Sequence, residues 1–522
     1  MRLDRRVVAV WALGAALALL WVVLNLPSDD LAGATYRADL FSADGFLLWD
    51  NGWYAGHHML AYSVLYPPAG ALLSPRLLGV LATVAAVVAF QQLVTRAYGQ
   101  RAWIAGAWFA VAAGANLFAG RIPYTFGMAI GLWALVAWQR KRTVLTLVLA
   151  LLTGLASPVA GLFLGLGALA KALSGVRLRR KRGQEPRERG APVTGQKTSG
   201  GAGLAVLVLL CAVVPPGVLS ALFPEGGAMP FDLTSYLPCL GVSLLLVVAL
   251  PREETALRVG AVLYGLLATA AFLFDSPIGG NIARLGALFA GPVLAAAVLG
   301  RRDAARWRVA AVAIVALPLV WWVLAPVVKQ LRVGDDPAVQ ASYYRPLLRF
   351  LADRPSPMRV EIPPTRFHWE ATYVPERFAI TRGWERQLDN RYAHLFYAGT
   401  LTPSRYVRWL RNTGTSYVAL PTRATPDYAA VAERRLLNAG VPGLREIWHD
   451  ADWKVWHVPD SGLQGITSVG REGFSVRGTV PAARVRWTRW WEPQSGGFVS
   501  RAPGGWTDVR TGPGGRIHVR AG

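Results

Sequence analysis

Long apolar runs recur between residues 7 and 328 and limit what this chain can fold into. About 20 consecutive apolar residues span the hydrocarbon core of a bilayer. Eleven runs approach that length, at residues 7–26, 76–95, 102–119, 123–139, 143–156, 158–174, 202–223, 234–250, 256–274, 284–300 and 309–328. Only 16% of the 522 residues are charged, while 53% are hydrophobic. We therefore predict an all-α polytopic membrane domain of about eleven transmembrane helices over residues 1–329, not a soluble enzyme.

The first apolar run has an alternative interpretation as a signal peptide, because small residues near Ala32–Ala34 resemble a cleavage site. Its apolar core is longer than that of a typical signal sequence, which favours a membrane helix. The two cysteines, Cys211 and Cys239, both fall within apolar runs, so the sequence indicates no disulfide framework and no zinc site.

Basic residues give the chain a net charge of +24, and they cluster at alternate ends of the apolar runs. The clusters are Arg2, Arg5 and Arg6; Arg96 and Arg101; Arg140–Arg142; Arg177–Arg182; Arg252 and Arg258; and Arg301, Arg302, Arg306 and Arg308. Because basic loops stay in the cytoplasm, we expect a multi-pass protein of the plasma membrane with a cytoplasmic N-terminus. Residues 143–174 then form a hairpin that turns outside at Ser157–Pro158, and the tail after residue 329 is extracytoplasmic. No nucleic-acid motif accompanies the charge, so nucleic acid is not an expected partner.

Composition changes along the chain predict further regions. Residues 175–201 are rich in Arg, Gly and Pro and predict a disordered cytoplasmic linker, with lipid or partner binding as the alternative. Residues 330–460 mix helical patterns with strand-like runs such as "SYVALP", which predicts an extracytoplasmic α/β domain. Residues 461–522 alternate apolar and polar residues between turns, which predicts a C-terminal β-sandwich module.

The stretch "RADLFSADGFLLWDNGWYAGHHMLAYSVLYPPAG", residues 37–70, follows the first apolar run and is rich in acidic and aromatic side chains. In the predicted topology it is the first outer loop. A carboxylate there suits a general base acting on a hydroxyl, and aromatic rings suit sugar stacking or the membrane interface. The candidates are Asp39, Asp44 and Asp50 for proton transfer, Trp53 for the sugar, and His57 and His58 for a phosphate or a divalent cation. The alternative is that these are ordinary solvated side chains at a helix exit.

The same loop holds, in order, Asp39-x-Phe41, Gly45, Trp49, Trp53, Gly56, Tyr62 and Tyr66-Pro67-Pro68. This order resembles the first outer loop of GT-C superfamily glycosyltransferases and their bacterial relatives. Those proteins are multi-helix membrane enzymes that transfer a sugar from a polyprenyl phosphate to an acceptor outside the cytoplasm. Their hallmark is an essential acidic residue shortly after the first membrane helix, and Asp39 fits that position best. The architecture of a helical membrane half followed by an external mixed domain resembles the family over most of the chain.

The resemblance implies a hexosyl- or pentosyltransferase that works by an inverting displacement, with Asp39 as the base. Its partners would be a polyprenyl-phosphate-linked sugar donor, a glycan or glycolipid acceptor and membrane lipids, in the biogenesis of a bacterial cell envelope. The chain departs from the family in lacking the familiar Asp-Glu or Asp-x-Asp pair in this loop. A metal requirement, for Mg²⁺ or Mn²⁺, therefore stays open.

A few other charged groups lie on the outer side in the predicted topology. Arg121 and Arg284 stand at outer helix ends, where guanidinium groups would stabilise a departing lipid phosphate. Snorkelling of these arginines to lipid headgroups is the alternative. Asn281 shares a loop with Arg284 and is a further candidate for the same cavity. In the tail, Trp384 and Glu385 are candidates to contact substrate, with ordinary domain docking as the alternative.

Two other classes of protein compete with a glycosyltransferase. A transporter or lipid flippase would carry ionisable residues inside its helices, but the predicted spans are almost free of acids. A non-catalytic envelope protein that acts through its external domain would not explain why residues 37–70 are rich in acidic and aromatic side chains. The chain has no G-x-S-x-G elbow, no P-loop with its lysine, no H-E-x-x-H and no C-x-x-C.

Overall fold

The computed structural model describes residues 4–182, 200–300, 306–494, 496–512 and 515–522. They divide into two compact units, each built from separate parts of the sequence. Unit 1 comprises Met1–Leu26, Tyr62–Leu222 and Met229–Leu331, and unit 2 comprises Pro27–Ala61, Phe223–Ala228 and Arg332–Gly522. The loop after the first apolar run therefore belongs to the same unit as the tail.

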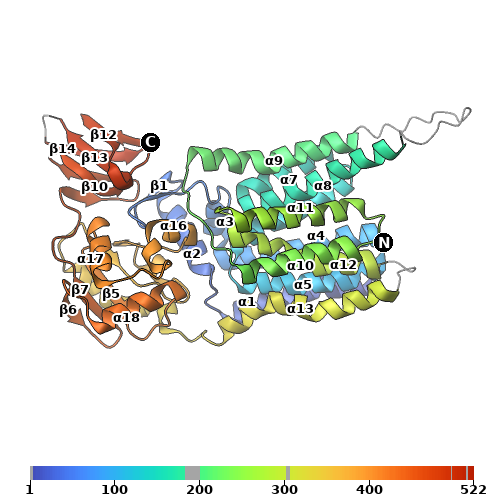
Figure 1. Cartoon of the computed structure of the whole chain (residues 1–522), viewed down its shortest axis with the longest axis horizontal. Coiled ribbons are helices and arrows are strands. Elements are labelled where there is room, and N and C mark those ends of the chain that lie inside the picture. The colour runs from blue at the N-terminus through green and yellow to red at the C-terminus, as the bar shows by residue number, and fades with distance from the viewer. Residues whose placement is uncertain (1–3, 183–199, 301–305, 495, 513–514) are drawn as a thin grey trace, which may run out of the picture. The chain divides into compact units, whose positions relative to one another are not determined.

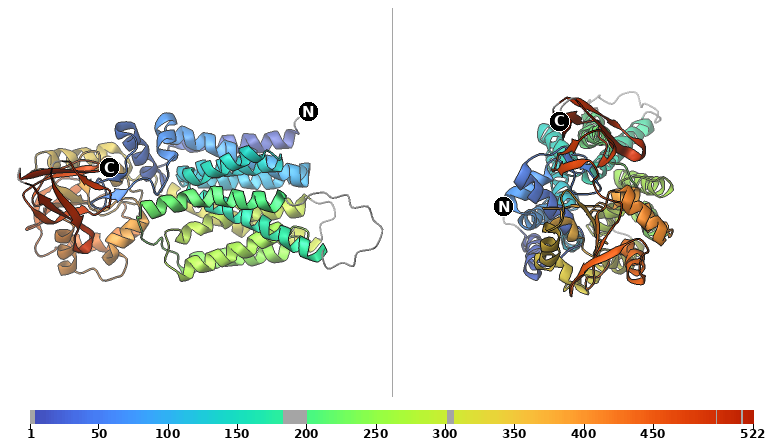
Figure 2. Two further views of the ribbon diagram at one scale, coloured as in Figure 1. Left: turned by 90° about the horizontal axis from the view of Figure 1, so that it is seen from above. Right: turned by 90° about the vertical axis from the view of Figure 1, so that its left-hand side faces the viewer.

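Unit 1 is a bundle of helices that run alongside one another in two views (Figures 1 and 2). Its helices are α1 (Arg5–Leu24), α3 (Tyr66–Leu73), α4 (Pro75–Tyr98), α5 (Trp103–Phe118), α6 (Ile122–Gln139), α7 (Thr143–Ala156), α8 (Pro158–Arg182), α9 (Gly200–Leu222), α10 (Leu233–Ala249), α11 (Thr255–Leu273), α12 (Ala283–Leu299) and α13 (Arg306–Leu331). Every predicted apolar run corresponds to one of these helices. Seven described helical segments are long and apolar enough to cross a membrane, and α7 and α10 are shorter apolar helices. The predicted polytopic helical membrane region is confirmed.

Residues 143–174 are two helices and not one long span, as the predicted hairpin requires. The first helix, α7, ends at Ala156, and Ser157 is extended, with φ −158° and ψ 114°. Pro158 then starts α8, where its missing N–H costs nothing. Helix α8 continues to Arg182, so residues 175–182 of the predicted linker are helical, and residues 183–199 lie outside the described residues.

Small residues allow the helices of unit 1 to approach closely. A Cβ atom added at Gly154 of α7 would lie 2.4 Å from the carbonyl oxygen of Ala212 in α9, and one at Gly161 of α8 would lie 2.5 Å from the same oxygen. Close approach at glycine and alanine is a common basis for helix packing in membranes, where apolar burial supplies little driving force between helices.

Unit 2 contains a mixed five-stranded sheet in the order β4-β3-β5-β7-β6. The strands are β3 (Arg359–Glu361), β4 (Ala379–Ile380), β5 (Tyr417–Pro421), β6 (Arg445–His449) and β7 (Trp453–His457). Strand β3 is parallel to β4 and β5, while β7 is antiparallel to β5 and β6. The helices of this region are α14 (Ala341–Ala352), α15 (Glu370–Tyr373), α16 (Arg386–Tyr392), α17 (Pro403–Asn412) and α18 (Val431–Ala439).

The C-terminal part of unit 2 has two further antiparallel sheets, β10-β13-β12 and β11-β14-β9-β8. Their strands are β8 (Ile466–Val469), β9 (Gly473–Arg477), β10 (Val480–Arg486), β11 (Trp491–Pro493), β12 (Gly497–Arg501), β13 (Trp506–Thr511) and β14 (Arg516–Ala521). Alternate apolar side chains of both sheets, among them Phe474, Val485, Val509 and Val519, form one buried cluster. Trp49 from the loop after the first membrane helix packs into that cluster.

Candidate active site

The loop that follows α1 folds into a helix and a small hairpin of unit 2. Helix α2 (Leu31–Asp44) is followed by β1 (Trp49–Asp50) and β2 (His57–His58), which pair antiparallel. Helix α2 packs against α15, where the Thr372 hydroxyl donates to the Ala32 carbonyl at 2.9 Å. Gly33 meets the indole of Trp384, since a Cβ atom at this position would lie 2.3 Å from the ring. One face of α2 is thereby fixed onto unit 2.

Asp39 is an exposed residue of α2 and lies between the buried residues Ala38 and Leu40. Partial desolvation of its carboxyl group, and then the nearby negative charge of Glu376, raise the pKa of Asp39 above its ordinary value. Asp44, at the end of the same helix, is also exposed. Both carboxylates are thus open to a substrate approaching unit 2.

Asp50 is in a different environment, because its side chain is fully buried. It accepts hydrogen bonds from the Tyr36 hydroxyl at 2.7 Å and from the backbone N–H of Gly52 at 3.0 Å. The guanidinium of Arg471 lies 3.5 Å from Oδ1 of Asp50, the oxygen that accepts from Gly52. Gly52 leaves room for this network, since a Cβ atom there would lie 2.3 Å from the Tyr36 hydroxyl. Asp50 is therefore held by internal partners, and it joins the hairpin to the sandwich through Arg471.

Trp53 and His57 form a buried stack within the hairpin. Their ring centroids are 5.3 Å apart, and the Trp53 indole donates to the Ala371 carbonyl at 2.9 Å. The His57 Nδ1 atom lies 3.1 Å from the Asp50 carbonyl oxygen, and burial lowers the pKa of His57, which favours the neutral ring. With Trp53 fully buried, its faces are closed to a sugar in this conformation.

His58 connects three parts of unit 2. Its Nδ1 atom is 2.9 Å from the Glu225 carboxylate, and its Nε2 atom is 3.0 Å from the Thr488 hydroxyl. Glu225 belongs to the short segment Phe223–Ala228, which lies between α9 and α10 in the sequence. These contacts place His58 in a structural junction of the hairpin.

Arg37, Trp384 and Glu385 form the contact between α2 and the segment before α16. The buried Arg37 guanidinium binds the Glu385 carboxylate and lies 5.3 Å from the Trp53 ring centroid and 5.4 Å from that of Trp384. The Tyr54 hydroxyl donates to the Glu385 carbonyl at 2.9 Å. Trp384 and Glu385 therefore position the helix that carries Asp39.

Directly ahead of α2 stands an acidic pair, Asp29 and Asp30, which is not among the predicted site residues. Asp29 forms a two-pronged ion pair with Arg366, at 3.0 and 3.2 Å, and Asp30 is the N-cap residue of the helix. Their position just after the first apolar run could have identified them as candidate site residues. Glu376 and Arg471 could not have been found in this way, because they lie more than 300 residues further along the chain.

Arg121, Asn281 and Arg284 lie in unit 1. Arg121 is the N-cap residue of α6, and Tyr124 follows one turn into that helix. The Arg284 guanidinium, on α12, lies 5.3 Å from the centroid of the Tyr124 ring. Asn281 is buried in a short 3₁₀ turn, Gly279–Ile282, immediately before α12. The structure thus brings Arg121 and Arg284 to the same tyrosine, from helices far apart in the sequence.

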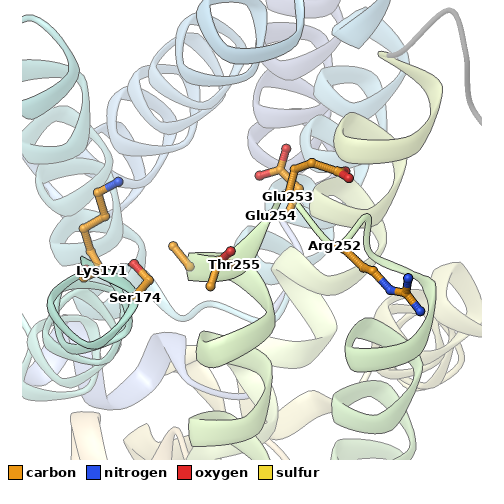
Figure 3. A pocket seen from close by; sticks show the side chains of 7 residues that line it. Lys171, Ser174, Arg252, Glu253, Glu254 and Thr255 are labelled. Carbon is orange, nitrogen blue, oxygen red and sulfur yellow. Dashed lines mark hydrogen bonds between the residues drawn. The ribbon is translucent and has the colours of Figure 1, made fainter. Parts of the chain in front are cut away.

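Within the described ranges, no group of three or more His, Cys, Asp or Glu side chains is arranged to hold a metal ion. Unit 1 does contain a pocket of about 460 Å³, lined by Lys171, Ser174, Arg252, Glu253, Glu254, Thr255 and Ala256 (Figure 3). None of the predicted site residues lines it, so we do not assign it to the candidate active site.

A comparison with solved structures gives a match to the arabinofuranosyltransferase AftD from Mycobacteria, with a TM-score of 0.50 and 17% identity. The match covers 91% of this chain and 41% of that one, so this chain spans less than half the length of AftD. The chain shares the fold of this glycosyltransferase. The shared fold agrees with the resemblance to GT-C glycosyltransferases that the sequence shows.

A second match is the oligosaccharyltransferase of Archaeoglobus fulgidus, solved with a tethered acceptor peptide and in the apo form. Its TM-score is 0.42 and its identity 13%, over 80% of this chain and 69% of that one. No protein-family model matches the sequence, and no curated protein matches it significantly.

Proposed function

We propose that the chain is a membrane glycosyltransferase that moves a hexosyl or pentosyl group from a polyprenyl-phosphate donor to an extracytoplasmic glycan or glycolipid. One observation carries the proposal. In a chain that shares the fold of AftD, the segment after the first membrane helix presents an exposed carboxylate, Asp39, from a helix whose buried residues fix it within unit 2.

Asp39 is the proposed general base. As the acceptor hydroxyl oxygen attacks the anomeric carbon, its proton passes to the Asp39 carboxylate. The bond between the anomeric carbon and the phosphate oxygen breaks at the same time, and polyprenyl phosphate leaves with the electron pair. One displacement of this kind inverts the anomeric configuration. The raised pKa of Asp39 favours this role, because a carboxylate of higher pKa is a stronger base near neutral pH.

The buried residues of the loop have a positioning role in this proposal. The contacts of Arg37 with Glu385, and of Asp50 with Tyr36 and Arg471, fix α2 and the hairpin within unit 2. Fixing a base in one orientation removes much of the entropic cost of reaching the reactive geometry. Arg121 and Arg284 are the proposed ligands of the donor phosphate, where a guanidinium fork would stabilise charge on the leaving group. We assign no step to a metal ion.

Lipid extracts of a deletion strain test the proposed reaction. Loss of the enzyme should cause a polyprenyl-phosphate-linked sugar to accumulate, and mass spectrometry would identify it. The wild-type gene should restore the normal level. If no lipid-linked sugar accumulates while the lipid composition of the two leaflets changes instead, the chain is a flippase and the proposal fails.

A further inference from the structure

The four-stranded sheet β11-β14-β9-β8 of the sandwich has an apolar inner face and a basic outer face. On β9 and β14, the inward residues Phe474, Val476, Ile517 and Val519 are buried. The alternating outward residues are polar, and most of them are exposed. We call the exposed basic residues among them the basic face, which comprises Arg477, Arg516, His518 and Arg520.

Two of these arginines are direct partners in the sheet. Arg516 on β14 is opposite Arg477 on β9, and directly opposed residues in an antiparallel sheet have Cα atoms about 5 Å apart. Like charges in that arrangement destabilise a sheet. An anionic ligand bound between these two guanidinium groups would offset the repulsion between them.

The acidic side chains of the sandwich have other partners. Glu472 binds Arg520 at 3.1 Å, and Glu492 is opposite Arg520 across β11 and β14. Asp508, on the second sheet, accepts from the backbone N–H of Ala482 at 2.7 Å. Residues 461–522 contain nine arginines and only these three acidic residues. Among the described residues, none of these three carboxylates forms an ion pair with Arg477 or Arg516.

We propose that the basic face binds an anionic polysaccharide, through the carboxylate or phosphate groups that such a chain carries along its length. Arg516 and Arg477 are opposite each other, and His518 follows Arg516 about 7 Å further along β14 on the same face. Arginine binds carboxylate and phosphate groups through paired N–H donors. The Ser475 hydroxyl, 3.0 Å from His518 Nδ1, adds neutral hydrogen-bonding capacity to the basic face.

A polysaccharide fits this face better than a lipid surface does. Stable attachment to a bilayer combines electrostatic attraction with apolar side chains that insert beneath the headgroups. The outward residues of β9 and β14 include no apolar side chain, because Ser475, Arg477, Arg516, His518 and Arg520 occupy those positions. The inference concerns binding alone and does not depend on the proposed transfer reaction.

Binding of oligogalacturonate to the full chain in detergent tests this inference, with the methyl-esterified oligomer as a neutral ligand of the same shape. The wild-type protein should bind the charged oligomer, and Arg477→Gln/Arg516→Gln should lower its affinity about tenfold, the sum of two surface ion pairs of roughly 0.7 kcal/mol each. Arg510→Gln, an exposed arginine on the other sheet, is the matched control and should change the affinity less than twofold. The double variant should melt no lower than the wild type, because it relieves the repulsion between Arg477 and Arg516.

Three outcomes would overturn the inference. The first is equal affinity of the double variant and the wild type for oligogalacturonate. The second is equal binding of the charged and esterified oligomers, which would mark the sheet as a site for neutral glycan. The third is competition by vesicles of anionic phospholipid that requires Arg477 and Arg516, which would assign the basic face to the membrane.

Discussion

Arg37 of helix α2 forms a buried ion pair with Glu385, a residue 348 positions further along the chain. The guanidinium also lies near the indole rings of Trp53 and Trp384, at 5.3 and 5.4 Å from the ring centroids. A buried ion pair is costly to break, because the partner that remains is a charge without compensation. This pair therefore fixes the helix that presents Asp39, and it does so from the interior of unit 2.

Replacing one partner of this pair should destabilise the folded protein much more than replacing both partners. Arg37→Met leaves Glu385 buried and unpaired, which should cost about 3–5 kcal/mol. Arg37→Met/Glu385→Gln removes both charges and should recover a large part of that loss. Thermal unfolding of the full chain in detergent, followed by tryptophan fluorescence, measures the effect. An unchanged melting temperature in Arg37→Met would show that the ion pair does not hold α2 in place.

The helices of unit 1 were predictable because the length and hydrophobicity of each apolar run are enough to indicate a helix in a membrane. The run at 143–156, for example, needs no distant residue to become a helix in a lipid environment, since only helices satisfy their own backbone groups there. The break at Ser157 also followed from local chemistry, because Pro158 suits the first turn of a helix and not its interior.

The division of roles within the first loop was not predictable in the same way. Asp39 and Asp50 look equivalent in the sequence, and only the contacts separate them. Burial of Asp50 depends on Tyr36 and on Arg471, which lies more than 400 residues further along the chain. Likewise, the buried stack of Trp53 on His57 depends on Ala371, whose carbonyl accepts from the indole. Partners so distant in the sequence leave no local pattern.

Arg121 and Arg284 should not tolerate lysine if they bind the donor phosphate. An ammonium group keeps the charge but loses the planar fork of donors. Arg121→Lys and Arg284→Lys should therefore lower turnover by about tenfold or more, the loss of one charge-assisted hydrogen bond of roughly 1.5–3 kcal/mol. Single-turnover rates at matched protein levels give the comparison, with Arg258→Lys, at the start of α11, as a control expected to keep its activity. Normal rates in both test variants would show that these arginines contact lipid headgroups and do not bind the donor phosphate.

His368 should make the stability of unit 2 depend on pH. It lies between two carboxylates, with Nδ1 3.4 Å from Glu370 and Nε2 3.6 Å from Asp427, while Arg386 also approaches Nε2, at 3.4 Å. Although burial opposes its charge, the neighbouring carboxylates of Asp427 and Glu370 raise the pKa of His368 to about 9. Because the folded pKa exceeds the ordinary value of about 6.5, the stabilisation is complete below pH 6.5 and is lost as the pH rises through 9.

The wild-type protein should accordingly melt at a lower temperature at pH 9.5 than at pH 6.5. The substitution His368→Asn suits the left-handed backbone at this position, where φ is 57°, and should flatten that difference. His449→Asn is the control, because the imidazole of His449 is 70% exposed and its ion pair with Glu446 is screened by solvent. An equally steep response in His368→Asn and the wild type would show that another group controls the pH dependence.

The predicted orientation can be tested with single cysteines in a chain that lacks Cys211 and Cys239. Gly195→Cys should react with a membrane-impermeant maleimide only from the cytoplasmic side, and Gly470→Cys only from outside. Gly470 is exposed, and a Cβ atom there meets no neighbour closer than 3.8 Å, so the substitution should not disturb the sandwich. Labelling of both positions from the same side would contradict the orientation, and with it an extracytoplasmic reaction.

The most direct test of the whole account is the rate at which Asp39→Asn releases polyprenyl phosphate from the lipid-linked sugar that accumulates in the deletion strain. The amide keeps the size of the side chain but cannot accept the acceptor's proton, so the rate should fall by roughly 10²–10⁴-fold. An exposed substitution of this kind should change the free energy of unfolding by no more than about 0.5 kcal/mol. Asp44→Asn should retain most of the activity, and Asp50→Asn should lower the melting temperature because it disrupts the buried contacts with Tyr36 and Arg471. We predict a folded and inactive Asp39→Asn enzyme, and an Asp39→Asn enzyme that works at the wild-type rate would contradict the role of Asp39 as the base.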